Sequence, residues 1–189
     1  SPQGDFFGSV EREVNAIFLE SDAGQRVNIV DAAADNVRAG MKIRGSSSTS
    51  FPKKQFSFET RDENGDDKNV SLLSMPKGSD WVIYAPYSDK SLIRNYLSYH
   101  WSNEMGLQAS RTRLAEVYLH TGGGRVDSGD YHGVYVLIEK IRRDNDRVDI
   151  TKLEVGDNSF PEVSGGYIFK KDRLDPGDSG FHTSTGVEL

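Results

Sequence analysis

One segment of this 189-residue chain, residues 41–59, combines the residue types that bind anions. Its centre is a glycine followed by a run of hydroxyls, with Arg44 before it and Lys53 and Lys54 after it. Small residues let a ligand approach the backbone closely, so that N–H groups and hydroxyls can face an anion. Cationic side chains on both sides would neutralise its charge. The predicted phosphate-binding residues are Arg44, Gly45, Ser46, Ser47, Ser48 and Lys54.

A serine-rich hairpin without a ligand explains the same segment. The Gly-x-x-x-x-Gly-Lys-Ser/Thr spacing of a P-loop is missing, as is the Gly-x-Gly-x-x-Gly run of dinucleotide sites. Taken alone, the segment therefore favours the plain hairpin. Lys53 is the alternative to Lys54, because neighbouring side chains of an extended strand point to opposite faces.

Other polar residues indicate no metal site. The four histidines, His100, His120, His132 and His182, show no metal-binding spacing and are interpreted as surface or structural residues. The acidic segment 61–68 resembles a calcium loop, but its glycine stands at position 4 instead of 6 and position 12 is no glutamate. Its Asn64-Gly65 pair predicts a hairpin turn. Asp172, Asp175 and Asp178 are interpreted as a solvated turn.

A further candidate is Glu139, a carboxylate at the end of the apolar run 133–138. Burying a carboxylate is costly unless it is paired or placed where the chain leaves the core. Glu139 is therefore either a paired structural residue or part of a site.

Composition excludes several classes of protein. The net charge of −6 argues against nucleic acid as the main partner. No apolar run approaches the roughly 18 residues of a membrane span. The absence of cysteine excludes disulfides and thiol catalysis. Because the chain begins Ser-Pro-Gln-Gly, we expect it to be a piece of a longer protein.

The elements that must position these residues are mostly strands. Period-two patterns and turn residues predict strands at 13–20, 26–30, 40–44, 54–60, 81–85, 113–120, 132–141 and 165–169. Residues 31–39 are predicted to form a loop or a short helix. The continuous apolar run in 132–141 is typical of a central strand covered on both faces.

One helix is predicted, over residues 90–105. Ser88 or Asp89 can cap its start, and Gly106 supplies its stop. Its apolar stripe consists of Leu92, Ile93, Tyr96, Leu97, Trp101 and Met105. Because this stripe is expected to lie in a core, Trp101→Ala should cost about 3–5 kcal/mol. The predicted fold class is α+β, a mostly antiparallel sheet with one main packed helix.

Seven motifs occur in an order that resembles the CotH family of atypical protein kinases, named for a bacterial spore-coat protein. They are Lys-Ile-Arg-Gly-Ser-Ser-Ser (42–48), Phe-Pro-Lys-Lys-Gln-Phe (51–56), Asp-Trp-Val-Ile-Tyr-Ala (80–85), Leu-Ile-Arg-Asn (92–95), Met-Gly (105–106), Glu-Val-Tyr-Leu (116–119) and Gly-Val-Tyr-Val-Leu-Ile-Glu-Lys (133–140). The resemblance covers about residues 40–172. It implies three regions: N-terminal strands and loop at 1–39, a kinase-like N-terminal region at 40–172, and the start of another segment at 173–189.

The resemblance also implies a function. A kinase-like N-lobe would bind ATP with Mg²⁺, and phosphate would pass to Ser or Thr of a protein acceptor that is secreted or on the cell surface. The loop from Arg44 to Ser50 would cover the phosphates and Lys54 would neutralise them. The strand ending at Glu139 would lead to the segment where adenine meets the backbone.

The catalytic residues are unassigned. Kinases need one aspartate to position the nucleophile and another to hold magnesium. Neither a His-Arg-Asp nor an Asp-Phe-Gly pattern occurs in the chain, so these ligands are expected beyond Leu189. The alternative is a non-catalytic module of the cell envelope or extracellular matrix with the same fold.

Overall fold

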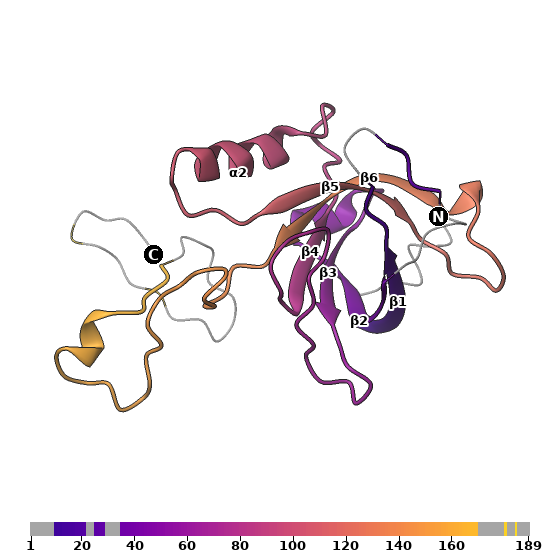
Figure 1. Ribbon diagram of the computed structural model, residues 1–189. Helices are drawn as coiled ribbons and strands as arrows, with labels where there is room; N and C mark the ends of the chain where they lie inside the picture. The colour runs from indigo at the N-terminus through magenta and orange to yellow at the C-terminus, as the bar shows by residue number, and fades with distance from the viewer. Residues whose placement is uncertain (1–9, 22–24, 29–34, 170–179, 181–183, 185–189) are drawn as a thin grey trace. The chain divides into compact units, whose positions relative to one another are not determined.

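The structure, a computed structural model, describes residues 10–21, 25–28, 35–169, 180 and 184. The chain divides into two compact units, Ser1–Arg142 and Arg143–Leu189. The strands and the α-helix described below all belong to the first unit (Figure 1). No helix among the described residues has the length and apolar character needed to cross a membrane.

The first unit is built on a six-stranded antiparallel sheet in the order β1-β2-β3-β4-β6-β5. Its strands are β1 (Arg12–Phe18), β2 (Asp35–Arg44), β3 (Gln55–Thr60), β4 (Asp80–Tyr84), β5 (Thr112–Tyr118) and β6 (Tyr131–Glu139). Together with one α-helix this sheet confirms the α+β class and its mostly antiparallel character.

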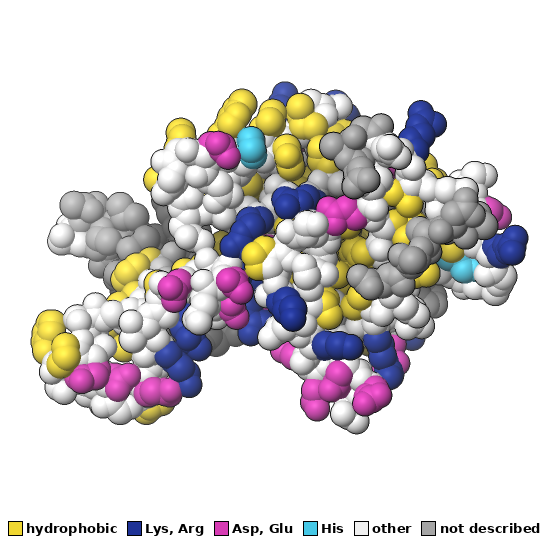
Figure 2. All heavy atoms as spheres, viewed as in Figure 1, with side chains coloured by type: hydrophobic (Ala, Val, Ile, Leu, Met, Phe, Trp, Pro, Cys, Tyr) yellow, Lys and Arg dark blue, Asp and Glu magenta, His cyan; other side chains and the backbone are white. Residues whose placement is uncertain are grey.

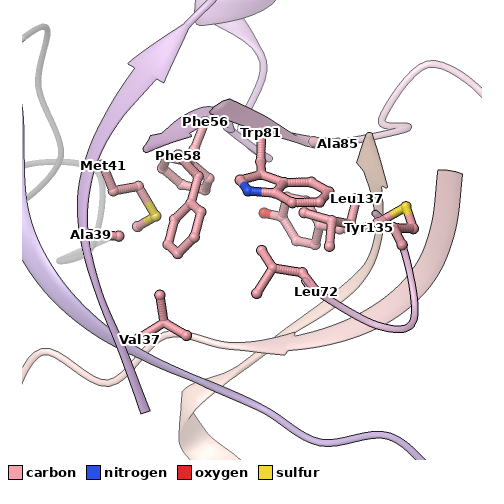
Figure 3. Packing of buried hydrophobic residues seen from close by; sticks show 11 residues of the cluster. Val37, Ala39, Met41, Phe56, Phe58, Leu72, Trp81, Ala85, Tyr135 and Leu137 are labelled. Carbon is pink, nitrogen blue, oxygen red and sulfur yellow. The ribbon is translucent and has the colours of Figure 1, made fainter. Parts of the chain in front are cut away.

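One face of the sheet carries the larger core. Aromatic and aliphatic residues from β2, β3, β4 and β6 meet there, and the segment between β3 and β4 closes over them (Figure 3). The core residues are Val37, Ala39, Met41, Phe56, Phe58, Leu72, Met75, Trp81, Ala85, Tyr135 and Leu137. Trp81 is fully buried, and its Nε1–H donates to the carbonyl of Gly78 at 3.1 Å.

The opposite face has a smaller cluster of Val82, Val136 and Ile138, against which Tyr84 and Tyr99 pack. Tyr99 belongs to helix α2 (Arg94–Glu104), which follows β4 in the chain. Strand β6 lies between β4 and β5 and contributes to both cores. This confirms the prediction that its continuous apolar run forms a central, doubly covered strand.

The C-terminal stop of α2 is the predicted one, whereas the helix begins four residues later than expected and its N-cap is Ile93, not Ser88 or Asp89. The carboxylate of Asp89 accepts the N–H groups of Ser91 at 3.0 Å and Arg94 at 2.9 Å. Gly106 has φ +76°, and the next N–H, of Leu107, returns to the carbonyl of Ser102 at 2.9 Å. Such a left-handed residue ends a helix, and glycine adopts it without a steric penalty.

The predicted burial of the helix is wrong. None of the residues of α2 is buried, and the side chains of Trp101 and Met105 are 59% and 69% exposed. The helix residue that packs on the smaller sheet cluster is Tyr99, which is not one of the predicted stripe residues. The expected cost of 3–5 kcal/mol for Trp101→Ala is therefore wrong as well, because no core contact is lost.

The prediction of a loop or short helix at 31–39 is wrong for residues 35–39, which are rich in small side chains. Residues 35–39 belong to β2, where Ala39 pairs with Val14 and is fully buried. A Cβ on the adjacent Gly40 would collide with the side chain of Glu11 and approach that of Arg61. Alanine and glycine are thus required by close packing, which overrides their low strand propensity. Residues 31–34 lie outside the described part.

Two further strand predictions fail where the described residues supply no partner strand. Residues 25–28 form no strand, and 29–30 lie outside the described part. Residues 165–169 of the second unit are also irregular, after a short 3₁₀ turn at Glu162–Ser164. A strand is stabilised by pairing with its neighbours, so a short apolar run alone is insufficient.

The acidic segment after β3 forms the predicted turn. Gly65 has φ +88°, and the N–H of Asp62 donates to the carbonyl of Asp66 at 2.8 Å. The Asp62 carboxylate accepts the N–H groups of Asn64 and Asp66 at 2.8 and 3.0 Å, and these bonds lower its pKa. Its acceptor oxygen is therefore used to hold the turn.

Candidate functional site

The candidate site is the loop between β2 and β3, residues 45–54, at one end of the sheet. Antiparallel pairing brings the end of β2, the start of β3, the end of β4 and the start of β6 to this end. We call it the loop end of the sheet. Predicted site residues Arg44 to Ser48 and Lys54 all lie there.

A glycine with a positive φ begins the loop. Gly45 has φ +113°, and a Cβ at this position would collide with the side-chain oxygen of Ser48. The chain then turns through a 3₁₀ helix at Ser47–Ser50. Glycine is required at position 45 both for its backbone conformation and for the close approach of Ser48.

Several loop hydroxyls bond within the loop. The hydroxyl of Thr49 donates to the carbonyl of Ser46 at 2.6 Å, and that of Ser50 to Ser47 at 2.7 Å. The Ser48 oxygen accepts a bond from the side-chain amide of Gln55 at 2.6 Å. These bonds fix the loop in one conformation. The positive charge available to an anion comes from the basic side chains around it.

The two lysines after the loop have different partners. Lys54 donates from Nζ to the carbonyl of Thr49 at 2.7 Å, on the exposed surface. Lys53 is partly buried: its Nζ donates to the carbonyl of Val134 at 2.5 Å and lies 4.4 Å from the centre of the Tyr135 ring. Burial lowers the pKa of Lys53. Lys53 therefore joins the loop to strand β6.

The start of β6 is shaped to receive Lys53, which the sequence analysis did not foresee. Gly133 has φ +100°, and a Cβ there would lie 3.2 Å from the Lys53 Nζ. The ring of His132 stacks on Tyr135 with centroids 6.0 Å apart. Burial, and secondly the charge of Lys53, lower the pKa of His132. The available signal was the His-Gly pair at the start of an otherwise apolar run.

Aromatic residues join the loop to the segment after β4. The ring of Phe51 contacts that of Tyr87 with centroids 5.1 Å apart. Lys90 lies over the Tyr87 ring, with Nζ 4.4 Å from its centre. The loop end thus gathers basic side chains from three separate segments. They are Arg44, Lys53, Lys54, Lys90 and His132.

Glu139 is not brought to this site. It pairs with Trp81, three positions along β4 from the loop end at Tyr84. Its carboxylate is 4% exposed, accepts the Arg111 backbone N–H at 3.0 Å and pairs with the Arg111 guanidinium at 3.1 Å. Of the two alternatives open for Glu139, the geometry supports a paired structural carboxylate.

The described residues offer donors for an anion and few ligands for a metal. No group of three or more His, Cys, Asp or Glu side chains that could hold a metal ion occurs in the described part of the chain. The loop end, with its lysines, Arg44 and fixed loop, carries cationic hydrogen-bond donors of the kind that anions accept.

Comparison with known proteins identifies the family of the chain. A family model described as "CotH kinase protein" matches residues 41–187. The match begins within β2 and includes the whole 45–54 loop, helix α2 and strands β3 to β6. A search of curated proteins gave no match. Because the family model covers most of its length, the chain belongs to the CotH kinase protein family.

Proposed function

We propose that the loop end of the sheet binds the phosphates of ATP in a CotH-type kinase that phosphorylates Ser or Thr of a secreted or surface protein. The observation that carries this proposal is a loop fixed by its own hydrogen bonds, with Lys53 and Lys54 at its exit and Arg44 at its entrance. Phosphoryl transfer depends mainly on positioning and charge stabilisation, which such an arrangement supplies.

Each cation has a distinct part in the proposal. A lysine ammonium has three N–H donors. One donor of Lys53 holds Val134 and one of Lys54 holds Thr49, so each lysine keeps donors for a phosphate oxygen. The exposed guanidinium of Arg44 supplies a planar, bidentate donor on the other side of the loop.

In common protein kinases the lysine that contacts the ATP phosphates lies on the third strand of the N-terminal lobe. The proposed phosphate-binding lysines of this chain lie elsewhere. The third strand of the matched region is β4, Asp-Trp-Val-Ile-Tyr, which has no lysine. In the proposed site the charge comes instead from the loop exit. This favours Lys53, which is anchored to β6, as a phosphate ligand alongside Lys54.

The family implies Mg²⁺ with ATP, which would shield charge on the phosphates. The described residues form no group of metal ligands, so they do not fit this ion and we derive no step through it. The proposal for this chain is limited to holding and orienting the polyphosphate.

Calorimetric titration of this chain with ATP and magnesium tests the proposal. Arg44→Ala, Lys53→Met and Lys54→Met should each weaken binding about tenfold to a hundredfold, because each removes a charge-assisted hydrogen bond worth roughly 1.5–3 kcal/mol. Lys77→Met, an exposed lysine near the opposite end of β4, is the matched control and should bind like the wild type.

Transfer of radiolabel from ATP to a protein acceptor then tests the reaction. Variants that lose ATP affinity should lose transfer in parallel. Wild-type affinity in all three folded loop-end variants would remove the phosphate site. The non-catalytic envelope module would then be the better interpretation.

A further inference from the structure

A histidine that has no part in the proposed phosphate site lies directly beside it. His132 stands at the start of β6, and its partly buried ring stacks on Tyr135 with centroids 6.0 Å apart and planes 15° from parallel. The Nζ atom of Lys53 lies 4.4 Å from the centre of the same Tyr135 ring. Tyr135 is fully buried in the larger core, as Figure 3 shows, so its ring is a fixed support. Two basic side chains therefore share one immobile aromatic ring.

The backbone of β6 holds Lys53 at this position. Its Nζ donates to the carbonyl of Val134 at 2.5 Å. Gly133 has φ +100°, and a Cβ there would lie 3.2 Å from the same Nζ. Lys53 thus contacts the three residues that follow His132 in the chain. The ammonium and the imidazole are therefore held near each other by contacts that do not depend on a ligand.

The closeness of the two groups affects their charge. Like charges disfavour each other, and burial disfavours the charged form of each group. The pKa of His132 is lowered, first by burial and then by the charge of Lys53. The imidazole is therefore neutral near pH 7, and the positive charge of the pair is carried by the lysine.

The other titratable groups on the neighbouring elements have partners of their own. The carboxylate of Glu116, on β5, accepts the hydroxyl of Tyr131 at 3.0 Å. That of Asp130, just before β6, contacts Nδ1 of His120 at 2.9 Å. Burial raises the pKa of Tyr135, so this phenol stays neutral. The charge that acts on the imidazole is therefore that of the loop lysine.

A polyphosphate at the loop end would reverse this balance. Its oxygens would compensate the charge of Lys53 and would add negative charge near the imidazole, and both changes favour the charged form of a histidine. We propose that His132 is a further, proton-linked residue of the phosphate site, which takes up a proton from solvent when a polyphosphate binds beside Lys53. This inference rests on the proposed function, because it requires a phosphate at the loop end. By linkage, the proton and the polyphosphate strengthen each other's binding by the same factor.

The first test follows the histidine ring protons of the 189-residue chain by nuclear magnetic resonance from pH 5 to 8, without ligand and with saturating ATP and magnesium. We expect the titration midpoint of His132 to rise by about one pH unit when ATP is bound, which corresponds to about tenfold tighter binding by the protonated form. His132→Gln assigns the resonance. His100, which stacks on Tyr96 within α2, is the internal control and should keep its midpoint.

A second test needs no nucleotide. Lys53→Met should raise the midpoint of His132 in the free protein, because the repulsion by the ammonium is lost. Figure 2 shows that Lys and Arg side chains also lie elsewhere on the surface, beside Asp and Glu side chains. A control must therefore remove a distant positive charge. Lys77→Met does so and should leave the midpoint of His132 unchanged.

Calorimetry measures the effect on affinity. Because phosphate groups themselves take up protons near pH 6, His132→Gln is compared with the wild type at each pH. The ratio of wild-type to variant affinity for ATP should be about threefold to tenfold larger at pH 5.5 than at pH 7.5. His100→Gln, the matched control, should show no such change. If His132→Gln fails to fold, the ring titration of the wild type decides the question alone.

The outcomes separate this inference from the function on which it rests. Binding of ATP with an unchanged midpoint of His132 would overturn the inference and leave the phosphate site intact. Equal rises at His132 and His100 would show a general effect of the anion and would overturn it as well. No binding of ATP to the wild type at either pH would reject the proposed function, and the inference with it.

Discussion

Strand β4 and helix α2 are neighbours in the chain, and each carries one of the two tryptophans. Trp81 on β4 is fully buried, whereas Trp101 on α2 is 59% exposed. The strand lies between β3 and β6 and has core clusters on both faces. The helix packs against β5 and contributes Tyr99 to the smaller cluster.

An apolar pattern in the sequence therefore shows which face of a strand or helix is apolar, but it does not show whether another element packs on that face. A strand with a neighbour on each side buries both of its faces whenever the sheet is covered. An amphipathic helix buries only the part of its stripe that meets another element. Fold energetics should therefore depend strongly on β4 and weakly on the outer side of α2.

The largest expected effect is that of Trp81→Ala. The substitution removes a buried indole and its hydrogen bond to Gly78, so the free energy of unfolding should fall by about 3–5 kcal/mol. Chemical denaturation measures this loss. A fall below about 1 kcal/mol would show that the core does not depend on β4.

Glu139→Gln should give the next largest effect. It removes the negative charge from the pair with the Arg111 guanidinium, and breaking such a pair costs about 3–5 kcal/mol when it is fully buried. Arg111 is 37% exposed, so we expect a loss of about 2–3 kcal/mol. Lys140→Ala removes the exposed pair with Asp80 as a control and should cost less than about 1 kcal/mol. Equal losses would contradict the structural role of Glu139.

Much of the sheet was predictable because its strands carry strong local signals. The Trp81–Ala85 run, the two strands around the 121–131 loop and the turn at Gly65 follow from apolar patterns and turn residues. Residues 35–39 were not predictable in this way, because their strand is imposed by pairing with β1 and by the close approach of Glu11 to Gly40. Only tertiary contacts contain that information.

The site could be predicted in part. The 45–54 loop and its flanking cations follow from residue types and spacing, which are local. The placement of Lys53 against Val134 depends on two segments 81 residues apart, and so does the need for glycine at position 133. Family resemblance placed Glu139 on the strand that leads to the segment where adenine would meet the backbone. The strand register puts it three positions along the sheet from the loop end, and its carboxylate pairs with Arg111.

Acidification should lower the free energy of unfolding by less than either Trp81→Ala or Glu139→Gln, through His132 at the loop end. The folded state holds the pKa of His132 below its usual value near 6.5, mainly through burial. As the pH falls through 6.5, the unfolded chain binds a proton that the folded chain does not, so stability decreases. Denaturation at pH 7.5 and 5.5 measures the decrease. His132→Phe should reduce it, and an unchanged pH dependence would exclude His132 as its source.

The smallest effect is expected from Trp101→Ala, and its smallness is what distinguishes the helix from the strand. The indole is 59% exposed, so its truncation forfeits little buried area and leaves no internal cavity. Surface changes of this kind usually alter stability by within about 0.5 kcal/mol. Denaturation of Trp101→Ala beside Trp81→Ala, under one set of conditions, measures both. If the two losses were equal, α2 would have to be packed in solution by something that covers Trp101. A loss near zero would confirm that the indole lies at the surface and that the fold does not depend on it.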